Sequence, residues 1–356
     1  MATNGLRLGF VSAAHLHLGG LLRAAYECPE AEVVGLAEPD DELRGHFQQQ
    51  FSGLPVYSRV EELYERGQPR AIITCADNRA AADVIDEAAA RGVHVMKEKP
   101  MAADLQLADR MATTAARSGI RLMVNWPTNW QPAIHYAKQL VDEGRIGQVW
   151  QVHNRAGHGG PPADFAKRGP VSRVGWGWLI EREQNGGGAF VDFCSYGAAI
   201  SRWFMGQPSR VMAMGGRYSK EFFTVEDNAI LVLGYPRGHS VCEGTWTQPA
   251  TPVRTPLMIY GAEGTIAVTG PAEVSIATRP AGGGQPESQV LQAPALHDHF
   301  RSGPAYFVHQ LLNEQPFEGL VSLAVSRDAQ EILQGGLISM ESGCEVGLPL
   351  KAYLKA

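Results

Sequence analysis

Three charged residues stand together in the N-terminal half of the chain, directly after a short apolar run. The run 93–96 is typical of a buried parallel strand, and Lys97-Glu98-Lys99-Pro100 follows it, with the proline ending the strand. In open α/β sheets, ligands bind in the crevice outside the carboxyl ends of the strands. The cluster therefore indicates a ligand site, although the same residue types also suit a solvated turn.

A second candidate site follows the first predicted strand, Leu6–Ser12. A dinucleotide-binding loop carries glycines here, because its backbone must approach a pyrophosphate at a helix N-terminus. This chain has Ser12 and Ala14 where the first two glycines would stand and His17 at the third, which is a weak signal by itself. His15 and His17 have the spacing of metal ligands, but no third partner is obvious, so we expect loop residues near a pyrophosphate and no metal site.

An acidic residue ends the next predicted strand. That strand covers residues 32–37, and Glu38 follows it at roughly the interval at which a carboxylate holds ribose hydroxyls. A carboxylate there repels a 2′-phosphate, so the sequence favours NAD as cofactor over NADP.

Strand and helix patterns alternate through the first 125 residues. Further strands are predicted at 70–76 and 120–125, and helices at 18–25, 40–51, 80–90 and 104–117. Strands that alternate with helices of this length form right-handed βαβ units around a parallel sheet. We therefore expect an α/β protein whose residues 1–125 form a doubly wound Rossmann domain that binds NAD.

Strand patterns follow one another beyond Trp126. They occupy 148–155, 210–218, 228–235, 240–247 and 257–268, with helices predicted at 131–143, 188–204 and 320–340. Neighbouring strands joined by turns indicate an antiparallel or mixed sheet. Residues 126–356 are therefore expected to form an α+β domain for substrate binding and oligomerisation, with a large open, mostly antiparallel sheet. One face of that sheet should be buried on a partner subunit, in a homodimer or homotetramer.

Composition limits the classes of partner. The 356 residues carry a net charge of −6 and no Lys/Arg run, which argues against nucleic acid or an anionic membrane. The five cysteines are scattered without CxxC spacing, and no run has the length of a membrane span or the form of a secretory signal. We expect a cytoplasmic protein that acts on small molecules.

Several motifs occur in order along nearly the whole chain. Glu98-Lys99-Pro100 follows Ala90-Arg91-Gly92-Val93-His94-Val95, while Ala76-Asp77-Asn78 lies upstream. A glycine run, Gly186-Gly187-Gly188, precedes Asp192 and Tyr196. This combination resembles the Gfo/Idh/MocA oxidoreductases, in which the corresponding patterns are A-x-G-x-H-V, E-K-P, T-P-N and, after a glycine run, D-x-G-x-H-x-x-D. Tyrosine replaces the histidine of the last pattern, similar to the branch with glucose-fructose oxidoreductase and the dihydrodiol dehydrogenases.

The resemblance implies an NAD-dependent oxidoreductase that moves a hydride between nicotinamide and a secondary hydroxyl or ketone of a sugar, cyclitol or glycoside. Tyr196 is implied to transfer the proton. The pKa of a free tyrosine is about 10, so Tyr196 needs a neighbouring cation to stabilise its phenolate near neutral pH, and Lys99 is the obvious one. Asp192 lies four residues before Tyr196, on the same helix face, and is expected to grip a sugar hydroxyl.

The remaining expected contacts divide between cofactor and substrate. The cofactor residues are Ser12, Ala14, His15, His17, Glu38, Asn78, Glu98 and Lys99. His158 and Trp176 are expected to join Lys99, Asp192 and Tyr196 at the substrate, Trp176 from a glycine-rich loop.

Two other functions agree with the same residues. One is glycoside cleavage in which transient oxidation by NAD acidifies a neighbouring C–H and the bond breaks by elimination. The other is a sensor that binds NAD or a sugar without turnover, which the altered glycine loop makes plausible. Tyr196 could also be a half-buried core residue.

Overall fold

Two compact units make up the chain. The structure, a computed structural model, describes residues 5–248, 257–280, 282 and 284–350. One unit comprises 1–126, 161–187 and 298–327, and the other 127–160, 188–297 and 328–356. The expected division after residue 125 falls beside the first junction, but the later returns of the chain to the first unit were not expected.

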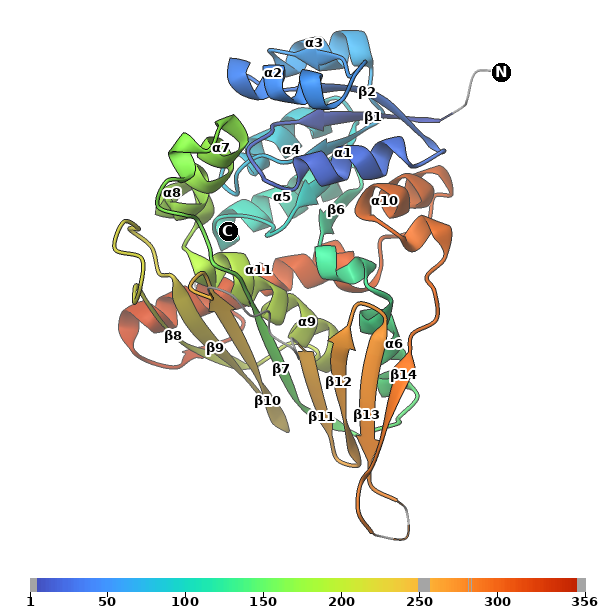
Figure 1. Cartoon of the computed structure of the whole chain (residues 1–356), viewed down its shortest axis with the longest axis vertical. Coiled ribbons are helices and arrows are strands. Elements are labelled where there is room, and N and C mark those ends of the chain that lie inside the picture. The colour runs from blue at the N-terminus through green and yellow to red at the C-terminus, as the bar shows by residue number, and fades with distance from the viewer. Residues whose placement is uncertain (1–4, 249–256, 281, 283, 351–356) are drawn as a thin grey trace. The chain divides into compact units, whose positions relative to one another are not determined.

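The first unit contains a six-stranded parallel sheet in the order β3-β2-β1-β4-β5-β6 (Figure 1). The strands are β1 (Leu6–Val11), β2 (Ala31–Ala37), β3 (Val56–Tyr57), β4 (Ala71–Thr74), β5 (His94–Glu98) and β6 (Leu122–Asn125). The order reverses at β1, which has β2 on one side and β4 on the other, and ligands of doubly wound sheets bind at such a reversal. The predicted doubly wound sheet is confirmed.

The helices of the first unit are α1 (Leu18–Tyr26), α2 (Asp41–Gln50), α3 (Val60–Glu62), α4 (Ala81–Ala90), α5 (Leu105–Ser118), α7 (Pro170–Gly177), α8 (Arg182–Asn185) and α10 (Gly303–Leu312). Three of them, α2, α5 and α10, begin after a residue whose side chain caps the first turn. In α5, the Asp104 carboxylate accepts a hydrogen bond from the N–H of Leu107 at 2.8 Å, and Gly119 ends the helix at φ +73°. α1 buries Leu18, Leu21, Leu22 and Ala25, a helical spacing that explains its packed face.

The second unit contains a nine-stranded sheet in the order β14-β13-β12-β11-β7-β10-β9-β8-β15. Its strands are β7 (Val149–Gly157), β8 (Arg210–Gly216), β9 (Asn228–Tyr235), β10 (Gly238–Thr245), β11 (Leu257–Gly261), β12 (Gly264–Gly270), β13 (Glu273–Thr278), β14 (Glu287–Gln292) and β15 (Val346–Gly347). Among the described strand pairs of this nine-stranded sheet, only β7 and β10 run parallel, so the predicted mostly antiparallel sheet is confirmed.

One strand prediction was wrong. Residues 257–268 were expected as a single strand, but β11 and β12 form a hairpin around Ala262 and Glu263. Both strands have inward apolar residues, and the turn signal between them, Gly261 and Gly264 on either side of Ala262 and Glu263, was not used to divide the run. The sequence analysis also missed β13 and β14.

Helices cover one face of the larger sheet. α9 (Ser195–Met205) contacts β7 and β10, and α6 (Pro132–Asp142) contacts β12 and β13, while α11 (Leu323–Ser342) is the last long helix. In β8, Val211 and Ala213 are buried, whereas Met212 and Met214 point the other way and are 45% and 66% exposed. The second face of β8 is therefore apolar and accessible.

The cysteines and the helices bear on the remaining expectations. Four cysteines are buried and Cys344 is exposed, all as free thiols, and the cytoplasmic location stays a prediction. Among the helices that the structure describes, none has both the length and the apolar character that crossing a bilayer requires.

Candidate active site

The loop after β1 has a glycine-like backbone conformation at its first position, although it lacks glycine there. Ser12 has φ +67°, the left-handed region that usually requires glycine, at the position of the first glycine. α1 begins after His17, whose side chain makes no capping hydrogen bond. The first turn of α1 therefore presents its positive end to an anion without competition from a capping side chain.

Glu38, at the carboxyl end of β2, is tied to this loop. Its two carboxylate oxygens accept hydrogen bonds from the N–H groups of Ala13, at 2.5 Å, and Asp40, at 2.9 Å. Burial raises the pKa of the carboxyl group, and these backbone hydrogen bonds oppose that rise. A carboxylate has about four lone-pair sites, so two remain for a ribose diol.

The carboxyl end of β5 contains a fully buried lysine, Lys97, which the sequence analysis placed in the charged cluster but gave no role of its own. The Lys97 ammonium donates to Asn78 Oδ1 at 2.8 Å and to the Pro100 carbonyl at 2.7 Å. Burial lowers the pKa of Lys97 to about 7, against the opposing charge of Glu98. Asn78 in turn donates to Asn185 Oδ1 at 2.8 Å, so its amide joins the ends of β4 and β5 to the 161–187 segment. Its role as a cofactor contact stays a prediction.

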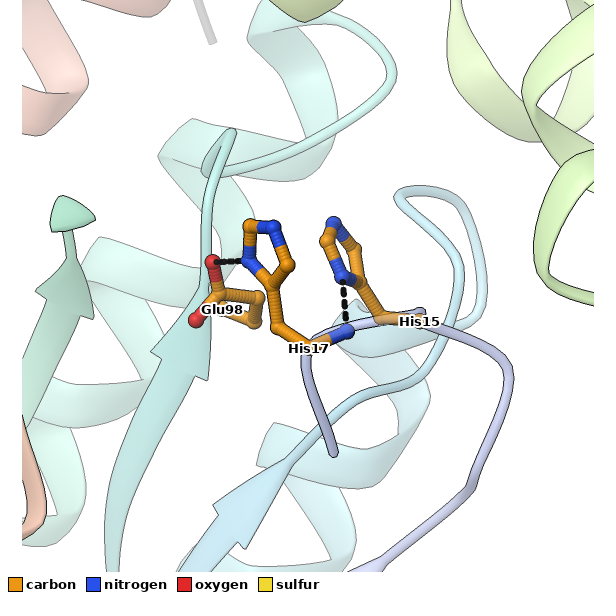
Figure 2. A group of neighbouring side chains, drawn as sticks. All are labelled: His15, His17 and Glu98. Carbon is orange, nitrogen blue, oxygen red and sulfur yellow. Dashed lines mark hydrogen bonds and ion pairs between the residues drawn. The ribbon is translucent and has the colours of Figure 1, made fainter. Parts of the chain in front are cut away.

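His15, His17 and Glu98 meet beside that lysine (Figure 2). His17 Nδ1 lies 2.8 Å from Glu98 Oε1, and the other Glu98 oxygen accepts from the Asn125 amide at 2.6 Å. His15 Nδ1 accepts from the backbone N–H of His17 at 3.1 Å, and the two rings are 4.3 Å apart. Burial, and then the charges of His17, Lys99 and Lys97, hold the pKa of His15 well below its usual range.

Lys99 follows this cluster directly and is only 3% exposed. Together with Ser12, Ala14, His15, His17, Glu38, Asn78 and Glu98, it lies at the carboxyl ends of β1, β2, β4 and β5. The structure thus gathers the predicted cofactor residues at one edge of the parallel sheet, where a ligand of a doubly wound sheet binds.

The 161–187 segment packs against the loop after β1. Trp178 Nε1 donates to the Ala14 carbonyl at 2.9 Å, and its ring lies 5.8 Å from the His15 ring. A Cβ atom on Gly175 would lie 2.4 Å from Leu16 Cδ2, so this helix needs a glycine to approach so closely. Arg173 pairs with the carboxylates of Asp40, at 3.1 Å, and Glu42, at 2.8 Å. Gly175 and Arg173 were not expected at the site from the sequence, whereas Trp178 was expected, with Trp176, as a stacking platform for a sugar and not as a partner of this loop.

The glycine-rich loop expected around Trp176 was wrong. Residues 170–177 form α7 and a 3₁₀ turn continues it through Trp178–Ile180. Pro170 at the helix start favours that conformation, because its φ is already helical and it lacks an N–H to satisfy. Trp176 is half-buried in α7, and its role as a substrate contact stays a prediction.

The second unit holds the other predicted catalytic residues. Asp192 lies in a π-helical turn, Phe190–Cys194, just before α9, and is 4% exposed. Its Oδ2 accepts a hydrogen bond from Trp246 Nε1 at 2.9 Å. The expected helix over 188–204 therefore starts with a wider turn, which places Asp192 against the sheet strand that precedes Trp246.

An aromatic row links Tyr196 to His158. Tyr196 is 8% exposed and stacks on Phe193 at 6.1 Å between ring centroids, and Phe193 meets the His158 ring edge-on at 4.9 Å. His158 Nδ1 accepts the N–H of Gly160 at 2.8 Å. Tyr196, Asp192 and His158 thus belong to one part of the second unit.

The glycines before Asp192 serve the packing of the chain itself. A Cβ on Gly186 would lie 2.0 Å from the Ala103 carbonyl oxygen, and one on Gly188 would lie 2.1 Å from that of Glu226. At these two positions the absence of a side chain allows a close approach to protein backbone.

Comparison with known proteins identifies the family. Residues 12–126 match the model of the oxidoreductase family with an NAD-binding Rossmann fold, and residues 134–267 match the GFO/IDH/MocA C-terminal domain.

Two curated relatives match part of the chain. The 2,7-anhydro-N-acetylneuraminate hydratase of Mediterraneibacter gnavus is 26% identical over 57% of this chain. The dTDP-3,4-didehydro-2,6-dideoxy-alpha-D-glucose 3-reductase of Actinomadura kijaniata is 27% identical, also over 57% of this chain. The matches span only 51% and 57% of those relatives' own lengths.

A solved structure matches nearly the whole chain. Levoglucosan dehydrogenase, in complex with NADH and levoglucosan, has a TM-score of 0.78 over 96% of this chain and 99% of that one, at 18% identity. At that identity the likeness concerns the fold. With both family models matched in order, the conclusion is that this chain belongs to the Gfo/Idh/MocA oxidoreductase family.

Proposed function

We propose that this protein is an NAD-dependent oxidoreductase that transfers a hydride between nicotinamide and a secondary hydroxyl or ketone of a sugar, cyclitol or glycoside. The observation that carries the proposal is the loop after β1, where Ser12 adopts the left-handed conformation of a dinucleotide loop and Glu38 is bonded to the same loop. Related proteins named as a dTDP-sugar reductase and a D-xylose dehydrogenase support the substrate class.

NAD fits the residues of this edge. The uncapped start of α1 would accept the pyrophosphate, and the lone pairs left on Glu38 would accept the adenosine ribose hydroxyls. The same carboxylate would repel the 2′-phosphate of NADP. When bound, the nicotinamide would accept or supply the hydride.

The chain's own residues would move the proton. Lys99 would hydrogen-bond the reacting oxygen and stabilise the phenolate of Tyr196, which would remove the hydroxyl proton. Asp192, held by the Trp246 indole in a fixed direction, would bind a neighbouring hydroxyl, with His158 and Trp176 as further substrate contacts. Oriented groups of this kind contribute to the rate because the substrate arrives already aligned.

Substitution of Lys99 tests the catalytic role. Purified protein is titrated with NAD⁺ and NADP⁺ and then assayed for NADH formation with a panel of sugars, cyclitols and glycosides. Lys99→Met preserves the packing of the stem and removes the charge, so activity should fall by at least about 100-fold with little change in melting temperature. Lys138→Met, which removes a surface ion pair with Asp142, is the control and should keep full activity.

Three results would count against the proposal. Absence of binding of either nucleotide would reject it. Glycoside release without net NADH would point to oxidation followed by elimination. Binding without any hydride transfer, unchanged in Lys99→Met, would point to a sensor.

The proposal includes a homodimer or homotetramer formed through the accessible face of the larger sheet. Met214 pairs across the strands with Ile230, and Met212 with Val232, so their side chains form an apolar row. A second copy would bury this row. Light scattering coupled to size exclusion should give at least a dimer, and a monomer at micromolar concentration would end this part of the proposal.

A further inference from the structure

The His15, His17 and Glu98 side chains form a compact donor set that the Gly-poor loop alone did not reveal. One potential ligand atom from each residue lies within 4.8 Å of the other two. The residues come from the β1–α1 loop and the end of β5, and their side chains face one another (Figure 2). The third partner that the sequence lacked for the two histidines is therefore present.

The burial of these groups favours a bound ion over a solvated contact. Glu98 has no exposed side-chain surface, and His15 is 5% exposed, whereas the His17 side chain is 42% exposed. A carboxylate that is removed from water needs compensating positive charge or hydrogen bonds. The open side at His17 leaves a route by which an ion could enter.

Neighbouring residues hold the donors in place. The Asn125 amide binds the second oxygen of Glu98 at 2.6 Å, and a Cβ on Gly303 would lie 2.4 Å from Asn125 Oδ1. The Trp178 ring packs beside the His15 ring at 5.8 Å. Outer contacts of this kind orient metal ligands in proteins.

We propose that His15, His17 and Glu98 bind one divalent first-row transition-metal ion of the Zn²⁺ class. Two imidazoles and one carboxylate are a common donor set for such ions, and they leave at least one coordination position open for water or another oxygen ligand. Ligand atoms about 2.1 Å from one ion lie about 3 to 4 Å apart, so the observed spread closes by small rotations of the rings.

Binding exchanges existing hydrogen bonds for metal bonds. A nitrogen that coordinates the ion must lack a proton, so coordination through His17 Nδ1 would replace its contact with Glu98, and coordination through His15 Nδ1 would replace the hydrogen bond from the N–H of His17. Two positive side chains, Lys97 and Lys99, act on His15 and oppose the ion. Lys97 is turned toward Asn78 and the Pro100 carbonyl, which limits that opposition. The inference does not rest on the proposed function, but its three ligands are also among the predicted cofactor residues, so the ion is titrated in the absence of nucleotide.

Metal titration of the full chain tests the site. The protein is purified without a histidine tag, stripped with EDTA and dialysed, and then titrated with Zn²⁺ by calorimetry. Co²⁺ serves as a second probe, because its visible absorption reports low coordination number. One equivalent of each ion should bind at micromolar concentration or tighter, and inductively coupled plasma mass spectrometry should find one Zn²⁺ per chain after gel filtration.

Five variants test the assignment of the ligands. Asn125→Ala removes an outer contact and should weaken Zn²⁺ binding by about 10- to 100-fold. Removal of a ligand should weaken it more, in each of the variants His15→Ala, His17→Ala and Glu98→Gln. His46→Ala, which removes an exposed histidine of α2, should leave affinity and stoichiometry unchanged. Circular dichroism and melting curves check folding, and the isosteric Glu98→Gln decides the question if a histidine variant unfolds.

Clear results would overturn the site. The proposal fails if wild type binds no Zn²⁺ at micromolar concentration. It also fails if binding is weak, of several equivalents, and unchanged in Glu98→Gln and His17→Ala, because the ion would then be held by scattered surface groups.

Discussion

The buried ammonium group of Lys97 should make stability depend on pH. Lys97 has no exposed surface, and burial lowers its pKa from 10.5 to about 7 in the folded chain. In the unfolded chain the group regains its ordinary pKa. Between these two values the unfolded state binds more protons than the folded state, so the free energy of unfolding rises with pH.

The size of the effect follows from these two values. The difference between 10.5 and about 7 corresponds to about 5 kcal/mol, at about 1.4 kcal/mol for each pKa unit. The whole penalty applies below pH 7, and it disappears as the pH rises through the unfolded value. Between pH 7 and pH 9 the wild type should therefore gain about 2 kcal/mol from this group.

Urea unfolding at pH 7, 8 and 9 measures the effect, with EDTA in the buffer so that no ion binds Glu98. Lys97→Met keeps the length of the side chain and removes the titration, so the stability difference between wild type and variant should change by about 2 kcal/mol over this range. The variant leaves Asn78 Oδ1 and the Pro100 carbonyl without their donor, which shifts its stability at every pH. The pH dependence, not the absolute stability, is therefore the test.

A surface substitution provides the control. Lys138→Met removes a solvent-exposed ion pair with Asp142 and should follow the wild-type pH dependence. If Lys97→Met also follows the wild type within about 0.5 kcal/mol from pH 7 to pH 9, then Lys97 does not titrate in this range and the reasoning fails.

Three further changes test the packing and the loop. Gly186→Ala should lower the free energy of unfolding by at least about 2 kcal/mol more than Gly119→Ala. Both glycines end helices at positive φ, but only an alanine at 186 would meet the Ala103 carbonyl. Equal urea midpoints of the two variants would contradict the clash. Burial lowers the pKa of His135, so as the pH falls the unfolded state takes up the proton before the folded state does. The free energy of unfolding should therefore fall below about pH 6.5, and it should fall less in His135→Phe. Urea midpoints at pH 5 and pH 7.5 check this difference. Ser12→Val should lower the free energy of unfolding by about 1 to 2 kcal/mol, because a β-branched residue resists φ +67°. Ser12→Gly should not lower it. Melting curves that rank the two variants the other way would contradict the strain.

The order of the secondary structure was readable from local patterns. β9 has the predicted bounds, and β1, β2, α4 and α5 lie within two residues of theirs. The capping residues explain this agreement, because Asp104 and Gly119 bound α5 by local hydrogen bonding and backbone preference. The β11–β12 hairpin was missed because its turn, at Ala262 and Glu263, lacks asparagine and proline and the flanking glycines, Gly261 and Gly264, were not used to divide the run.

Part of the candidate site was also readable. Glu38, Glu98 and Lys99 follow predicted strands, so the carboxyl-end rule locates them without a structure. The burial of Lys97 was not expected, because a charged residue beside a predicted turn suggests solvent, and only the fold shows that it is enclosed. Trp178 contacts Ala14 from 164 residues along the chain, and Arg173 contacts Asp40 from 133 residues along it, so local patterns do not reveal these contacts.

The sequence by itself determined the parallel sheet, the family and the residues at the strand ends, because each depends on short-range patterns or motifs. Only the tertiary structure decided that Glu98 lies against His17, 81 residues away. The sheet order puts β5 two strands from β1, about 10 Å, a gap that a glutamate and a histidine side chain close together. Which side chains meet across such a gap depends on sheet order and on side-chain direction at the strand ends, and neither is encoded in the spacing along the chain.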